Sequence, residues 1–120
     1  MRCPCGTGLP YDECCGRLHA GAPAATAEAL MRSRYSAYAV GDSAYLLSTW
    51  HPSTRPSRLR LDPDQSWTRL EVLARTGGGL FDAEGVVEFR AHAQRRGRPE
   101  TLHERSRFVR EGGRWWYVAG

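Results

Sequence analysis

Hydrophobic positions in the first half of the chain recur at helical spacing. Met31, Tyr35 and Tyr38 follow one another three or four residues apart, so they share one face of a helix. Thr26 precedes this stretch, and its hydroxyl can accept a hydrogen bond from a free N–H group of the first turn. Gly41 follows the stretch and can adopt the positive φ at which helices commonly end. The pattern therefore predicts a helix that begins near Thr26 and ends at Gly41.

A second, shorter helix is predicted to follow directly. Asp42 is a favourable N-terminal cap, and Leu46 and Trp50 lie one helical turn apart. Pro52 disfavours helical conformation at the residue before it, so we expect the helix to end there. The segment 52–66 holds three prolines and is predicted to be mainly loop.

The second half of the chain has the alternating pattern of strands. Along residues 85–93 the apolar positions 87, 89, 91 and 93 face one side, and the polar positions between them face the other. Strands are predicted over residues 67–74, 85–93, 101–111 and 114–119, with a tight turn at Gly112-Gly113 before the last of them. Helices followed by such a meander predict an α+β fold in which the helices lie on one face of a strongly bent antiparallel sheet.

Composition and charge are those of an ordinary globular protein and disfavour a membrane protein and a nucleic-acid-binding protein. The chain has 120 residues, of which 41% are hydrophobic and 25% charged, and these values suit one globular domain. No apolar run approaches the roughly 18 residues of a membrane span, and residues 1–5 lack the apolar stretch of a signal peptide, so we expect a cytoplasmic protein. All 17 basic residues are arginines and they are scattered. The one cluster, Arg95-Arg96-Gly97-Arg98, is interpreted as a solvated turn, and nucleic-acid binding is disfavoured because no aromatic residues interleave with it.

Four cysteines lie within thirteen residues at the N-terminus. Their spacing is Cys-x-Cys, eight residues, then Cys-Cys: Cys3, Cys5, Cys14 and Cys15. Two close pairs of thiolates joined by a short loop can surround one Zn²⁺ tetrahedrally. Four thiolates leave no coordination position for water, so such a zinc ion would be structural. A redox pair or unconnected thiols are the alternatives, and disulfides are disfavoured in a reducing compartment.

The same residues carry a family resemblance. Residues 3–16 resemble the SEC-C zinc motif, and residues 29–38, 45–55, 87–91 and 103–110 resemble the YchJ family. The resemblance implies a zinc knuckle over residues 1–19, followed by an NTF2-like domain over residues 20–120. In the NTF2-like fold, helices pack into the hollow of a curved sheet and form a cone. The resemblance carries no biochemical activity with it.

The mouth of such a cone would be a natural ligand pocket, because pockets combine apolar walls with a few polar groups. The candidate lining residues are Arg34, Tyr35, Tyr38, Trp50, His51, Trp67 and Glu104, with His103 and Arg105 on the same strand as Glu104. Each has a plainer interpretation. The tyrosines and tryptophans suit core packing, the ring of His51 suits bonding to the last carbonyls of a helix, and His103 suits the surface. His19 is a spare candidate ligand for the metal.

The charged candidates have specific constraints. Glu104 and Arg105 are neighbours on a strand, so they face opposite sides of the sheet. Glu104 paired with Arg34 inside the cone would be a structural salt bridge as readily as part of an active site. No serine or cysteine stands in a recognisable nucleophile motif.

Three functional hypotheses follow. The first is an interaction module whose zinc knuckle projects from the domain and docks a protein partner. The second is an NTF2-like domain that binds a small molecule in the cone, or an enzyme of isomerase or hydrolase type. The third is nucleic-acid or ribosome binding through the arginines. A homodimer formed through the sheet is compatible with all three.

Overall fold

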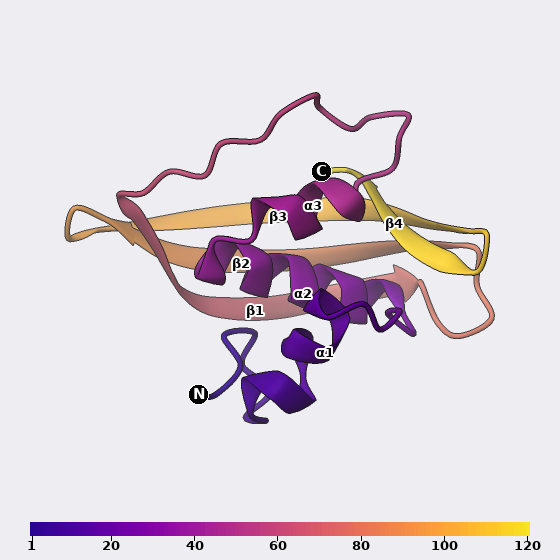
Figure 1. The fold of residues 1–120 in the computed structure, drawn as a ribbon, viewed down its shortest axis with the longest axis horizontal. Coiled ribbons are helices and arrows are strands. Elements are labelled where there is room, and N and C mark those ends of the chain that lie inside the picture. The colour runs from indigo at the N-terminus through magenta and orange to yellow at the C-terminus, as the bar shows by residue number, and fades with distance from the viewer.

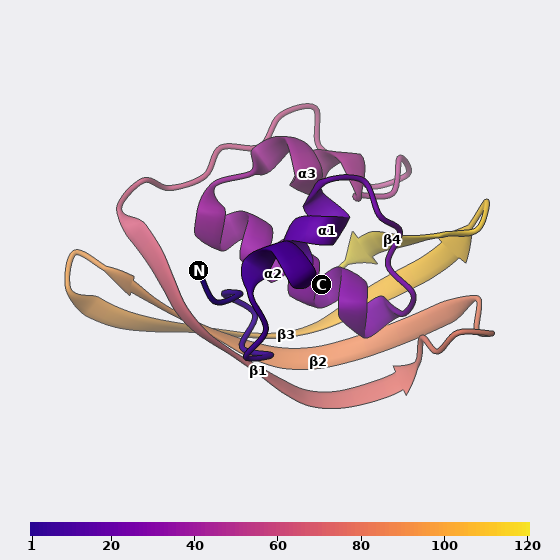
Figure 2. The ribbon, with the colours of Figure 1, turned by 60° about the horizontal axis from the view of Figure 1, so that its bottom comes forward.

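A four-stranded antiparallel sheet curves around the helices. The computed structural model describes residues 1–120, and its strands are hydrogen-bonded in sequence order: β1 (Gln65–Gly77), β2 (Glu84–Arg95), β3 (Arg98–Glu111) and β4 (Arg114–Ala119). The helices lie on the concave side of this sheet (Figure 1, Figure 2): η1 (Tyr11–Glu13), α1 (Cys15–His19), α2 (Ala27–Val40) and α3 (Ser43–Ser48). The predicted α+β fold with helices on one face of a bent sheet is confirmed.

The predicted helix boundaries are set by local capping. The Thr26 hydroxyl accepts a hydrogen bond of 3.0 Å from the N–H of Ala29, and Gly41 ends α2 with φ of 81°. The Asp42 carboxylate then accepts a bond of 3.0 Å from the N–H of Tyr45 at the start of α3. Both caps are confirmed as the sequence predicted them.

The prediction that α3 extends through Trp50 is wrong. The helix ends at Ser48, and the next residues run beside β4 instead. The N–H of Tyr117 donates to the Thr49 carbonyl at 2.9 Å, and the N–H of His51 donates to the Tyr117 carbonyl at 2.7 Å. These two long-range bonds hold residues 49–51 against β4, although the N–H groups of Thr49 and Trp50 still donate to carbonyls of α3.

The curvature of the sheet has a visible cause in β1. Its pairing with β2 shifts register between Trp67 and Arg69 and again between Val72 and Ala74, and such bulges bend and twist a strand. The strands are longer than predicted except β4, which has the predicted bounds. The Gly112-Gly113 turn is confirmed, with φ of 62° and 76°.

The core lies between α2 and the concave face of the sheet. The four alternating positions of β2, Val87, Phe89, Ala91 and Ala93, are all buried, which confirms the predicted inward face. The first three pack with apolar residues of α2, of β3 and β4, and of the N-terminal segment: Leu30, Met31, Tyr35, Phe108, Trp115, Cys3, Cys5 and Cys15. The N-terminal segment therefore belongs to the same core as the sheet.

Candidate metal centre and cavity

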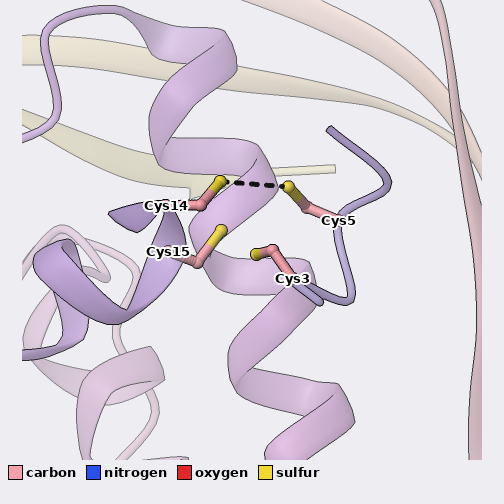
Figure 3. A group of neighbouring side chains, drawn as sticks. All are labelled: Cys3, Cys5, Cys14 and Cys15. Atoms are coloured by element: carbon pink, nitrogen blue, oxygen red, sulfur yellow. Dashed lines mark hydrogen bonds between the residues drawn. The ribbon is translucent and has the colours of Figure 1, made fainter. Parts of the chain in front are cut away.

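The four cysteine sulfurs converge at one point beside α2. Cys3 and Cys5 approach from the first loop, while Cys14 and Cys15 approach from the start of α1 (Figure 3). The four Sγ atoms all lie within 4.8 Å of one another, and those of Cys5 and Cys14 are 3.6 Å apart. The arrangement can hold one metal ion.

The loop between the two cysteine pairs folds back on itself because of its local sequence. Gly6 and Gly8 have φ of 87° and 85°, a conformation that side chains disfavour. The N–H of Cys3 then donates to the Leu9 carbonyl at 2.8 Å, which closes the loop. Gly16 allows the second pair to approach, because a Cβ at this position would lie 2.6 Å from the carbonyl oxygen of Tyr11.

The spacing of the sulfurs fits tetrahedral coordination. Four sulfurs at about 2.3 Å from a central Zn²⁺ would be about 3.8 Å apart. The observed separations of 3.6 Å and up to 4.8 Å need only small side-chain adjustments to reach this geometry. An all-sulfur donor set favours zinc and other thiophilic metals over magnesium or calcium.

The electrostatics of the cluster favour a charged sulfur. Hydrogen bonding from Cys15 lowers the pKa of the Cys5 thiol to about 4, and the same contact raises the pKa of Cys15. Burial raises the pKa of Cys14. A metal cation would bind at the Cys5 thiolate and would allow the remaining thiols to lose their protons.

The cysteine cluster is seated on α2, so the expectation of a projecting knuckle is wrong. Cys3, Cys5 and Cys15 are buried, and the Sγ of Cys3 lies 3.6 Å from the Ser36 hydroxyl. An Nη nitrogen of Arg32 donates to the Cys5 carbonyl at 2.8 Å. The cysteines therefore pack in the same buried cluster as apolar residues of α2.

His19 is not placed as a spare metal ligand. Its Nδ1 lies 2.5 Å from the Tyr11 hydroxyl, and its Nε2 lies 2.8 Å from the Ser33 carbonyl. Both ring nitrogens are thus engaged in joining η1 and α1 to α2.

A cavity of about 330 Å³ lies between α2 and the concave face of the sheet. Five of the seven predicted pocket residues line it: Arg34, Tyr35, Tyr38, Trp67 and Glu104. The remaining lining residues, which the sequence analysis did not single out for the pocket, are Met31, Gln65, Phe89, Ala91, Leu102, Ser106, Phe108 and Tyr117. Most of them lie on the inward face of β2 and β3, and the alternation of inward and outward positions along these strands could have predicted them.

Arg34 is the most buried charged residue of the cavity, with 5% of its surface exposed. One Nη nitrogen donates to the Leu46 carbonyl at 2.8 Å and to the Thr49 hydroxyl at 2.6 Å. The guanidinium carbon lies 4.3 Å from the ring centre of Tyr117 and 5.2 Å from that of Trp50. Burial lowers the pKa of Arg34 to about 10.

Glu104 faces the same cavity without forming a salt bridge to Arg34. Its carboxylate accepts a hydrogen bond of 2.6 Å from the Ser106 hydroxyl. A side chain at Gly120 would collide with this carboxylate, so the residue after β4 packs directly against it. Arg105 is exposed, as expected for its position on the opposite face of the sheet. The hypothesis of an Arg34–Glu104 ion pair is therefore wrong: Arg34 donates to the Leu46 carbonyl and the Thr49 hydroxyl, and Glu104 accepts from the Ser106 hydroxyl.

The two aromatic pocket candidates on α2 pack against a tryptophan of β1. The rings of Tyr35 and Tyr38 lie with their centres 6.1 Å and 6.0 Å from that of Trp67, at tilted or edge-on angles. Burial raises the pKa of Tyr35 to about 12. These rings form a wall of the cavity and leave its volume open.

Trp50 and His51 lie outside the cavity, contrary to expectation. The Trp50 ring packs edge-on against Tyr117, with ring centres 5.0 Å apart. The His51 ring does not bond to helix carbonyls: its Nδ1 lies 2.7 Å from the Ser53 hydroxyl and its Nε2 lies 2.8 Å from the Glu111 carboxylate. Trp50 thus packs against Arg34 and Tyr117, which line the cavity, without lining it itself.

Ser53, His51 and Glu111 form a cluster that the sequence alone did not indicate. His51 and Ser53 are two residues apart, but Glu111 is brought to them only by the tertiary fold. The backbone N–H of Ser53 donates to the His51 ring at 3.1 Å, so it is not free to stabilise an oxyanion. The cluster joins the loop after α3 to the end of β3.

The cluster of basic residues at positions 95–98 forms the turn that joins β2 to β3. Arg95 pairs with Asp62 and with Glu100, and Arg96 pairs with Asp64. No helix of the protein has both the length and the apolar character needed to cross a membrane.

Comparisons with known proteins agree with both parts of the structure. A family model described as the middle NTF2-like domain of YchJ matches residues 26–120, and the SEC-C motif matches residues 2–17. UPF0225 proteins of Streptomyces coelicolor and Chromobacterium violaceum are each 56% identical to this chain over 98% of its length and over 93% and 90% of theirs.

Two solved structures share the fold. A SEC-C motif containing protein from Rhodopseudomonas palustris is 39% identical, with a TM-score of 0.85 over 100% of this chain and 97% of that one. Another from Psychrobacter arcticus is 28% identical, with a TM-score of 0.82 over 98% and 80% of the two chains. The expected NTF2-like fold is confirmed, and the chain belongs to the YchJ family, whose relatives here carry the name UPF0225.

Proposed function

We propose that this is a zinc-binding protein in which the metal has a structural role. The convergence of the four cysteine sulfurs within 4.8 Å, from two segments of the N-terminal region, is the observation that carries the proposal. Bound zinc would supply the positive charge that keeps four thiolates together. Because Cys3, Cys5, Cys14 and Cys15 would fill its coordination sphere, the ion would hold residues 1–19 on α2 and would leave no position for a substrate.

Zinc content is the direct test of this proposal. Native mass spectrometry of the purified chain is expected to show one Zn²⁺ per molecule, and Cys14→Ser is expected to lose it. Thr7→Ala is a matched control, because the Thr7 hydroxyl lies 3.2 Å from the Cys14 sulfur and is not a ligand. A wild-type protein that is folded, metal-free and unaffected by added zinc would refute the proposal.

A second candidate function is the binding of a small molecule in the cavity. It is favoured by the open volume of about 330 Å³ in which a buried arginine and an inward-facing glutamate meet apolar walls. Ligand pockets have this combination of apolar lining and few polar groups. Changes in the NMR signal of the Trp67 indole on addition of ligand would detect occupancy, with the outer-face histidine signals as a reference.

Docking of a protein partner through the N-terminal segment stays a prediction. The cysteines are covered by α2, so a partner would meet the exposed side chains of the segment, among which Leu9 is 48% exposed and Met1 is 80% exposed. A pull-down with the wild type and with Leu9→Ser, each with and without chelator, tests this. Loss of the same partner in Leu9→Ser and after chelation would support docking, and capture that ignores both changes would refute it.

A further inference from the structure

Two opposite charges face the cavity without neutralising each other. Arg34 on α2 and Glu104 on β3 both line it, and neither forms a salt bridge with any charged side chain of the protein. A buried charge without an ionic partner is costly, so a polar ligand group that reaches both side chains would be bound favourably.

The guanidinium of Arg34 keeps hydrogen-bond donors free. Its two hydrogen bonds to the protein both come from one Nη nitrogen. The other two guanidinium nitrogens of Arg34 have no hydrogen-bond partner in the protein. They are not among the fully buried, unpartnered side-chain atoms, which are the indole nitrogens of Trp50 and Trp115, so they are accessible. Because Arg34 is one of the residues that line the cavity, these nitrogens are the candidate donors to a ligand there.

The Glu104 carboxylate supplies the complementary acceptor. The Ser106 hydroxyl occupies one of its acceptor positions, and a carboxylate has about four. A ligand must therefore accept a hydrogen bond from Arg34 and donate one to Glu104. Because the two side chains have opposite charges, a neutral ligand satisfies both, whereas an anion would be repelled by Glu104 and a cation by Arg34.

The size and the walls of the cavity limit the rest of the ligand. At roughly 30 Å³ for each water molecule, 330 Å³ corresponds to about eleven waters, or to a molecule of about ten non-hydrogen atoms. The rings of Tyr35, Trp67 and Phe89 give the walls an aromatic character. Such walls favour a flat, apolar body.

We propose that the cavity binds a small, neutral, planar molecule that carries an amide or lactam edge, with its carbonyl oxygen on Arg34 and its N–H on Glu104. This inference rests on the second candidate function, that the cavity is a ligand site. The amide edge is the simplest neutral group that presents an acceptor and a donor side by side.

Three probes of nearly equal size separate the possibilities: benzamide, benzoate and benzylamine. Dissociation constants are measured by NMR titration of the zinc-loaded protein, with the Trp67 indole as the reporter. For fragments of this size we expect benzamide to bind with a dissociation constant on the order of 1 mM and at least tenfold more tightly than the other two.

A charge change then tests the role of each side chain. In Glu104→Gln the cavity keeps the positive charge of Arg34 alone, so we expect benzoate to gain at least tenfold in affinity and to overtake benzamide. Glu88→Gln, on the outer face of β2 where Glu88 pairs with His103, is the control and is expected to leave the ratio unchanged.

The outcomes separate the two levels of the proposal. If benzoate or benzylamine shifts Trp67 as strongly as benzamide does, the ligand class is wrong although the cavity binds ligands. If no probe shifts Trp67, both the ligand class and the binding function of the cavity are overturned. The comparison of the three probes in the unmodified protein decides this even where Glu104→Gln does not fold.

Discussion

Replacing Arg34 by lysine tests whether the fold buries a full positive charge beside the cavity. Burial lowers the pKa of the guanidinium from 12.5 to about 10. Each pH unit of a lowered pKa corresponds to about 1.4 kcal/mol, so the buried charge costs folding about 3 kcal/mol at neutral pH. Arginine bears this cost over the whole physiological range because it does not lose its proton below about pH 10.

A lysine at this position would titrate within reach of experiment. Its unperturbed pKa is about 10.4, so the same burial would bring the folded-state value to about 8. Between about pH 8 and 10.4 the unfolded chain then binds more protons than the folded chain, and stability must rise with pH. Wild-type Arg34 itself begins to lose its proton above about pH 10, so relative to wild type we expect the free energy of unfolding of Arg34→Lys to increase by about 2 kcal/mol between pH 7 and 10.5.

Urea unfolding followed by tryptophan fluorescence, at four pH values from 7 to 10.5, measures this difference. Comparison with wild type at each pH cancels the titration of the tyrosines and cysteines. Arg90→Lys, at an exposed position of β2, is the control, because its ammonium is in water in both states and the difference should stay flat. If the difference in free energy of unfolding for Arg34→Lys were also independent of pH, water would reach residue 34. Arg34 would then not be a buried charge beside the cavity.

Three further predictions concern the metal, the packing of the sheet and a helix cap. Chelation of the wild type is expected to lower the melting temperature by roughly 10 °C or more in a thermal scan, and to leave Cys14→Ser, which has already lost a ligand, nearly unchanged. Gly85→Ala is expected to cost about 1–3 kcal/mol in urea unfolding, because the new Cβ would lie 2.6 Å from the Cα of Gly78 in the neighbouring turn. Thr26→Ala removes the hydroxyl that caps α2 and is expected to cost about 1 kcal/mol, measured in the same way.

Each of these has a matched control. Thr7→Ala should respond to chelation like the wild type, and an equal loss in Cys14→Ser would indicate that chelation acts elsewhere. Ala83 is exposed and lies two residues from Gly85, so Ala83→Ser is the control for Gly85→Ala and is expected to leave the free energy of unfolding unchanged. Thr26→Ser retains the hydroxyl, and a loss in this variant as large as in Thr26→Ala would contradict the capping argument.

Local chemistry explains what the sequence determined by itself. The caps at Thr26 and Asp42 and the left-handed Gly41 depend on bonds that span four residues or fewer, so the sequence alone places the helix starts and the end of α2. The alternation along residues 85–93 likewise reports which face of β2 is buried. The cysteine spacing was equally informative, because a metal centre built from two close pairs depends mainly on the short loop between them.

Long-range contacts decided the rest. Nothing near Trp50 in the sequence shows that β4 will pair with residues 49–51 and end α3 early, because the competing bonds come from Tyr117. The seating of the cysteines on α2 follows from their packing into the same buried cluster as apolar residues of α2, β2 and β3. The unpaired Arg34 and Glu104 are of the same kind: their residue types were visible in the sequence, but only the packing of α2 against β3 leaves both charges in one cavity.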